Sequence, residues 1–203
     1  MKAKRILSCI SLCCLMLFTS CDKTVDTKDM SPTEQYVAEE FSKRNITPGM
    51  SEEEVLTIEK DLTFTMDSSR SSVTSDGSIK SIYSNELVDF EGQQATVKYR
   101  FINDSLDSME YVITLEYPSS EILSQPAYSL YLELSFKYTE LLGNPASSNS
   151  DTTDNSFFSS YSNLWGSEES SYYLSIFGFQ SKYRSFTDEY NDTVIISFVA
   201  MEI

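Results

Sequence analysis

Apolar residues recur every three or four positions in three stretches of the chain, which is the period of an amphipathic helix. The first stretch starts at Ser31, which can cap a helix, and continues with Pro32 at the first helical position. Glu34 is placed to return the second bond of a capping box. We therefore expect a helix from Pro32 to about Lys43 that packs along one narrow face.

A second helix start follows at Ser51, where three consecutive glutamates, Glu52–Glu54, face the positive end of the helix dipole. Met50 and Val55 are placed for a hydrophobic staple. The glutamates have an alternative interpretation as a metal site or an acid/base pair. Consecutive helical residues point in different directions and cannot converge on one ion, so we favour a solvated first turn and predict no metal site.

The longest helical pattern runs from near Ala127 to Leu142, and Gly143 and Pro145 follow it as a left-handed cap and a helix stop. Its apolar stripe is rich in tyrosine and has two interpretations, a binding face for a partner or a side packed into the core. We favour the core because helices of this kind usually bury their apolar side. The stripe consists of Tyr128, Tyr131, Leu134, Tyr138 and Leu141.

From Leu62 onward the pattern changes to alternation, the period of a half-buried strand. The clearest pair covers 95–103 and 109–117, and the polar connection Asn103–Ser108 predicts a hairpin. The segment 193–201 is nearly continuous in apolar residues, so we expect it to be central or covered on both faces. The other predicted strands are Leu62–Met66, a short strand around Ile79–Tyr83, Phe157–Trp165 and Tyr172–Phe179.

Two polar segments are predicted as loops, the serine-rich 67–77 and the segment 146–156. Asp151 and Asp154 in the second segment are candidate calcium ligands. The segment lacks the alternating acids, the glycine and the distal glutamate of an EF-hand, so we predict a solvated loop.

The single tryptophan, Trp165, also has two interpretations. Together with Tyr172 and Tyr173 it resembles a platform on which sugars stack, but a lone tryptophan between strands is more often a core anchor. Helices and strands in this order predict an α+β fold, an antiparallel sheet packed by a few helices, in one domain over residues 31–203.

The N-terminal segment has the three parts of an export signal: basic residues, an apolar run too short to cross a bilayer comfortably, and small residues. Its end, Phe18–Cys21, resembles the bacterial lipobox. The resemblance implies a signal peptide over residues 1–20 and diacylglycerol on Cys21. An uncleaved anchor and an ordinary signal peptide are the alternatives.

Residues 21–30 are polar and predict a flexible tether behind Cys21. Loss of the three basic residues of the signal takes the formal net charge from −16 to −19. Such a surface repels nucleic acid and anionic headgroups, so we expect no nucleic-acid partner and membrane attachment through acyl chains alone. The expected location is the bacterial cell envelope, at the outer membrane rather than the inner.

The chain has no histidine, and none of its four cysteines follows Cys21. These residue types are needed for histidine-assisted hydrolysis, thiol redox chemistry and ordinary zinc sites. The six glycines show no phosphate-loop spacing. A carboxylate-pair glycosidase or a serine–lysine hydrolase stays open, but nothing singles out a pair, so we predict no enzyme, no cofactor and no catalytic residue.

A short motif, Gly49–Ser51 with Val55, precedes the alternating strand residues Val97–Phe101 and a hairpin through Leu106. Over residues 47–117 this order resembles the small outer-membrane lipoproteins of the BamE (SmpA/OmlA) type. The resemblance implies helices packed on a short antiparallel sheet, as in β-lactamase-inhibitor-like folds, and an envelope lipoprotein that binds other proteins.

The family's Leu-Gly-x-Pro motif is absent from that region and occurs instead at Leu142–Pro145, with further strands after it. This position suggests two degenerate helix-plus-sheet halves, 31–117 and 118–203. Because the departure affects the motif itself, a role in outer-membrane assembly is not carried over.

Two functions of different classes follow from these patterns. The leading hypothesis is a non-catalytic envelope lipoprotein that binds or scaffolds an envelope protein. The alternative is a surface lipoprotein that binds a glycan or another ligand, suggested by the aromatic C-terminal half.

Overall fold

The computed structural model describes residues 30–74, 77–118, 126–151, 158–166, 172–181 and 189–200. The predicted signal peptide, Cys21 and nearly all of the tether lie outside these residues, as does Asp154. The helices are α1 (Pro32–Lys43), α2 (Glu52–Ile58) and α3 (Pro126–Leu142). The strands are β1 (Phe64–Met66), β2 (Ser72–Thr74), β3 (Gly77–Ser84), β4 (Val88–Phe90), β5 (Gln93–Ile102), β6 (Ser105–Pro118), β7 (Ser147–Asp151), β8 (Phe158–Trp165), β9 (Tyr172–Ser181) and β10 (Glu189–Ala200).

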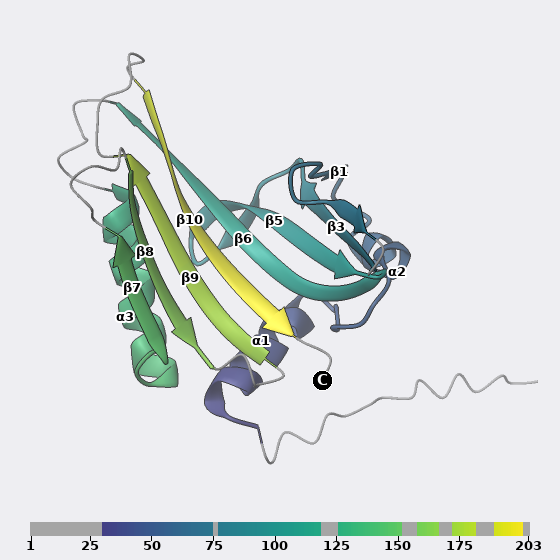
Figure 1. The fold of residues 1–203 in the computed structure, drawn as a ribbon, viewed down its shortest axis with the longest axis horizontal. Coiled ribbons are helices and arrows are strands. Elements are labelled where there is room, and N and C mark those ends of the chain that lie inside the picture. The colour runs from purple at the N-terminus through teal and green to yellow at the C-terminus, as the bar shows by residue number, and fades with distance from the viewer. Residues whose placement is uncertain are drawn as a thin grey trace, which may run out of the picture.

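The strands form one open sheet in which every pairing is antiparallel, in the order β1-β3-β5-β6-β10-β9-β8-β7. Strands β2 and β4 pair with β3 and β5 beside this path. The order places the last strand of each meander, β6 and β10, at the centre of the sheet (Figure 1). The predicted α+β class is therefore right, with the sheet as the larger part. The described part of the apolar segment 193–201 lies in the central strand β10, as expected.

Both early helices begin as the sequence predicts. The Ser31 N–H donates to Glu34 Oε2 at 2.7 Å, and the Ser51 N–H donates to Glu54 Oε2 at 2.8 Å, each within a complete capping box. The bonds from the Ser51 N–H and hydroxyl lower the pKa of the Glu54 carboxyl. Glu53 and Glu54 are exposed, as expected for a solvated first turn, whereas Glu52 is partly buried and pairs with Lys80.

The hairpin between β5 and β6 is tighter than predicted. Only Asn103 and Asp104 form the turn, with φ of 53° and 64°, and Ile102 pairs directly with Ser105. Two successive positive φ values match the twist of the flanking strands, so the pairing continues to the turn itself. Leu106, expected in the connection, is instead a buried strand residue opposite Phe101.

Two predicted loops contain strands. Ser147–Asp151 pairs with β8 as the edge strand β7, and Ser72–Thr74 pairs with β3 as β2. The side chains of β2 are exposed, as are those of residues 147–150, so neither strand carries the apolar alternation by which strands are recognised. Both segments are strands because their backbone groups pair with a neighbouring strand, and this pairing needs no apolar side chain.

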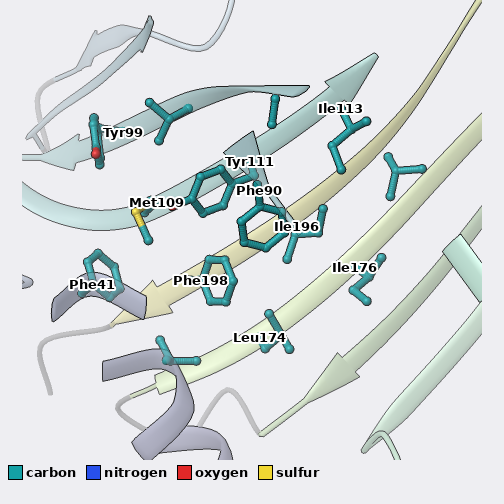
Figure 2. Close-up of a cluster of buried hydrophobic side chains, with 14 of the residues drawn as sticks. Phe41, Phe90, Tyr99, Met109, Tyr111, Ile113, Leu174, Ile176, Ile196 and Phe198 are labelled. Carbon is teal, nitrogen blue, oxygen red and sulfur yellow. The ribbon is translucent and has the colours of Figure 1, made fainter. Parts of the chain in front are cut away.

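The core lies on one face of the sheet, under α1 and α3. Helix α1 contacts β9 and β10, and α3 contacts β8, β9 and β10. Figure 2 shows Phe90, Tyr111 and Phe198 together inside this core, with Phe41 of α1 nearby. The rings of Phe90 and Tyr111 stack with their centroids 4.0 Å apart.

The tyrosine stripe of α3 belongs to this core, as predicted. Tyr131, Leu134 and Tyr138 are buried and Tyr128 is partly buried, whereas Leu141 is 53% exposed and lies outside the packed face. Gly143 has φ of 84°, and its N–H donates to Thr139 O at 3.0 Å, which confirms the left-handed cap.

Candidate functional site

The two faces of the sheet differ in their cover. Helices α1, α2 and α3 all contribute residues to the single core cluster, so they lie on the same face (Figure 1). The opposite face carries the alternate residues of each strand, such as Thr96, Lys98 and Arg100 on β5. No described helix packs against that side, which we call the uncovered face.

A cleft of about 240 Å³ opens on the uncovered face of the N-terminal half. Its walls come from the strands β3, β5 and β6 and from the turn 67–71, which bulges between β1 and β2. The lining residues are Arg70, Ile79, Ser81, Lys98, Tyr99, Arg100 and Glu110.

The turn 67–71 is fixed to strand β3 by hydrogen bonds. The Asp67 N–H donates to Ser81 O at 2.8 Å, and the Ser81 N–H donates to Ser71 Oγ at 3.0 Å. The Ser81 hydroxyl in turn donates to Arg70 O at 3.3 Å. These bonds place the Arg70 backbone directly beside β3, from where its side chain reaches over the sheet.

Lys98 is the cation of the cleft with the closest partner. Its ammonium donates to Asp67 Oδ2 at 2.7 Å, and both side chains are only 15% exposed. This bond, with a second from the Ser69 hydroxyl, lowers the pKa of Asp67 to about 2. The pair holds the turn 67–71 against the uncovered face.

The two arginines of the cleft are less engaged. Arg70 Nη1 lies 3.3 Å from Glu110 Oε2, and Arg100 Nη1 lies 3.7 Å from Asp107 Oδ2. Their side chains are 50% and 45% exposed. Burial raises the pKa of Asp107, whose Oδ2 has no hydrogen-bond partner among the described residues.

On the opposite side of β5, the floor of the cleft joins a buried polar network. The Tyr99 hydroxyl donates to Glu59 Oε1 at 2.6 Å and accepts a bond from Arg44 Nε at 2.9 Å. Arg44 and Glu59 form a bidentate pair, with N–O distances of 2.6 and 2.7 Å. Since Arg44 caps α1 and Glu59 caps α2, the network joins both helix ends to the sheet.

The other residues considered from sequence do not form a site here. Trp165 is 1% exposed and its indole N–H donates to Gly143 O at 2.9 Å, so it is the predicted core anchor and is not available for stacking on sugars. Asp151 ends β7, and its proposed companion Asp154 lies outside the described residues.

The cleft itself was missed at the level of sequence. Lys98 and Arg100 are two apart on the polar face of a predicted strand, in a chain with twice as many acidic as basic residues. That spacing is the one signal of a basic site in the sequence. Arg70 joins Lys98 and Arg100 only through the position of the turn 67–71, and the sequence of a serine-rich loop does not predict that position.

The comparisons add no relative to this description. No family model, no curated protein and no solved structure matches the chain. Within the described ranges, no helix has the length and apolar character to span a membrane. In the same residues, no group of three histidine, cysteine, aspartate or glutamate side chains has the geometry to hold a metal ion.

Proposed function

We propose that this protein is a non-catalytic lipoprotein of the bacterial cell envelope that binds an envelope protein through the uncovered face of its sheet. The acyl chains of Cys21 anchor it, at the outer membrane, and residues 21–30 act as the tether. The export signal and the cysteine at its end support the anchor.

One structural observation supports protein binding. The apolar residues Val112, Ile195 and Phe177 stand side by side on β6, β10 and β9, at the middle of the uncovered face. Phe177 is 38% exposed, and the other two are partly buried. An apolar centre within a polar rim is the usual composition of a protein interface.

The rows beside this apolar row carry hydroxyl groups. Thr114 pairs with Thr193 on one side, and Ser197 pairs with Ser175 on the other. These residues make the face uncharged over β10 and β9 at these rows, whereas Glu110, opposite Ser197 on β6, belongs to the charged cleft. A neutral or acidic protein surface therefore meets less repulsion over β10 and β9 than elsewhere on this strongly acidic protein.

Site-specific photo-cross-linking in intact cells tests this function. A cross-linkable residue at Ser175 or Ser197 is expected to capture the same protein, whereas one at Glu133, on the exposed side of α3, is not. The capture is expected to be lost in Ile195→Asp, which places a charge in the apolar row. Different proteins at the two positions, or equal capture at Glu133, would contradict the proposal.

The anchor is tested separately by the mass of the mature N-terminus from native membranes. A diacylated or triacylated Cys21 is expected. An unmodified N-terminus would remove the lipoprotein part of the proposal and leave the binding face untouched.

Glycan binding is the weaker candidate, because the residue that suggested it, Trp165, is buried. The two-halves hypothesis, 31–117 and 118–203, is retained as a proposal, supported by the two meanders that each end at a central strand. An experimental structure in which the halves do not superpose over a helix and four strands would contradict it.

A further inference from the structure

Three cationic side chains face one small cleft in a protein that has 15 basic and 31 acidic residues. Lys98 and Arg100 are two apart on β5, so their Cα atoms lie about 6.7 Å apart on the same face. Arg70 lies between them. Its carbonyl is bound by Ser81, opposite Arg100, and its guanidinium reaches Glu110, opposite Lys98.

The three cations differ in how many of their N–H donors are bound to protein acceptors. Lys98 is occupied by Asp67 at 2.7 Å. A guanidinium has five N–H donors, yet Arg70 makes one contact of 3.3 Å and Arg100 has its nearest carboxylate oxygen at 3.7 Å, beyond hydrogen-bond distance. Both arginine side chains are about half exposed, so their remaining donors are open to the cleft.

We propose that this cleft binds the carboxylate of an amino-acid-sized ligand, with the Arg70 and Arg100 guanidinium groups as the donors. A guanidinium presents paired N–H groups that match the two oxygens of a carboxylate. Asp107, beneath Arg100, stays close enough to hold the guanidinium in place without occupying its outer donors.

The charge around the cleft favours a carboxylate over a phosphate. Glu110 stands in the same wall, and the protein as a whole is strongly acidic. The cations Arg70, Lys98 and Arg100 are matched by the carboxylates of Glu110, Asp67 and Asp107, so the cleft has no net positive charge to attract a second negative charge. The acidic protein as a whole then repels a dianionic phosphate more than a singly charged carboxylate.

The size of the cleft limits the ligand. A volume of about 240 Å³ is below the roughly 300–1,000 Å³ of sites that hold drug-sized molecules. Ile79 supplies the apolar side chain of the lining, whereas the Tyr99 side chain is buried on the covered face. A single amino-acid unit fits this space, either the C-terminal residue of a peptide or a free amino acid. The inference rests on the cleft alone and does not depend on the lipid anchor or on a protein partner.

Isothermal titration of the full-length protein in a mild detergent, with four small probes, tests the site. N-acetyl-L-alanine carries the carboxylate alone, N-acetyl-L-alanine amide lacks it, L-alanine adds an ammonium group, and inorganic phosphate is the competing anion. Saturable binding of N-acetyl-L-alanine and no binding of its amide are expected.

The variants Arg70→Gln and Arg100→Gln are each expected to weaken N-acetyl-L-alanine binding about tenfold or more, since each removes a charge-assisted donor pair. Lys137→Gln is the matched control. Lys137 lies on α3, outside the cleft, where its side chain is 41% exposed and pairs with Glu91. This variant is expected to leave the affinity unchanged within about twofold. Unchanged thermal unfolding of all three variants shows that the fold is intact.

NMR spectra locate the bound N-acetyl-L-alanine through changes in the chemical shifts of backbone amides. These changes are expected at residues 79–81, 98–100 and 110. Tighter binding of L-alanine identifies a free amino acid as the source of the carboxylate, and equal or weaker binding identifies a peptide end. Tighter binding of phosphate, equal binding of the amide, or full affinity in both arginine variants would overturn the proposal.

Discussion

The covered and uncovered faces of the sheet both carry phenylalanine and arginine, but these residues differ in burial and in pairing between the two faces. On the covered face, Phe198 is fully buried and Arg44 is bound by both oxygens of Glu59. On the uncovered face, Phe177 is 38% exposed and the Arg100 guanidinium lies 3.7 Å from its carboxylate partner.

The difference separates side chains that hold the fold from side chains that are available to a ligand. A buried aromatic ring or bidentate ion pair has little surface left for contact with a ligand. A half-exposed ring or guanidinium contributes little to stability but keeps its contact surface and donors. Paired substitutions on the two faces therefore test the assignment directly.

The largest expected difference is between the two phenylalanines. Phe198→Ala is expected to lower the free energy of unfolding by about 3–5 kcal/mol, because it leaves a cavity in the core. Phe177→Ala is expected to cost about 1 kcal/mol, since much of that ring already faces water. Chemical denaturation measures both, and equal losses would contradict the assignment of the two faces.

The next largest effect concerns the buried ion pair. Glu59→Gln leaves the Arg44 charge without a counter-charge at a buried position and is expected to lower the free energy of unfolding by about 3 kcal/mol. Lys137→Gln, which breaks an exposed pair, is the control and is expected to change it by less than about 1 kcal/mol. A loss below that of the control would show that the network does not join the helix ends to the sheet.

A smaller effect is expected from acid. The pKa of Asp67 is depressed from 3.8 to about 2 in the folded protein, so its charged form stabilises the fold above pH 3.8 and this contribution is lost as the pH falls towards 2. In Asp67→Asn the decline of stability over this range is expected to be shallower. Parallel unfolding curves for the two proteins between about pH 4 and 2 would contradict the Lys98–Asp67 assignment.

The smallest effect is expected at the cleft. Arg100→Gln is expected to change the free energy of unfolding by less than about 0.5 kcal/mol, since the side chain is 45% exposed and makes no hydrogen bond to the described residues. Thermal unfolding measures it. A loss comparable to that of Glu59→Gln would place Arg100 among the residues that hold the fold.

The elements that could be predicted are those with local signals. The capping boxes at Ser31 and Ser51, the stripe and cap of α3, and the apolar run of β10 each combine a period with a start or stop residue. Strands β2 and β7 could not be predicted in the same way. The side chains of residues 72–74 and 147–150 are exposed and mostly polar, and only pairing with a neighbour, which is not visible locally, makes these segments strands.

The cleft escapes prediction for a related reason. Arg70, Lys98 and Glu110 belong to three separate segments, and their approach depends on the antiparallel register and on the folding of one serine-rich turn. Trp165 illustrates the opposite case. A lone tryptophan next to strands favours the core on general grounds, and that reasoning was sufficient.

The position of β10 in the sheet has a consequence for how the chain reaches its folded state. This strand pairs with β6 on one side and β9 on the other, and Ile195 faces Val112, a residue far earlier in the sequence. Long-range pairing of this kind slows folding, so the centre of the sheet closes late. A chain that stopped before β10 would expose the long edges of β6 and β9, and such open edges lead to aggregation.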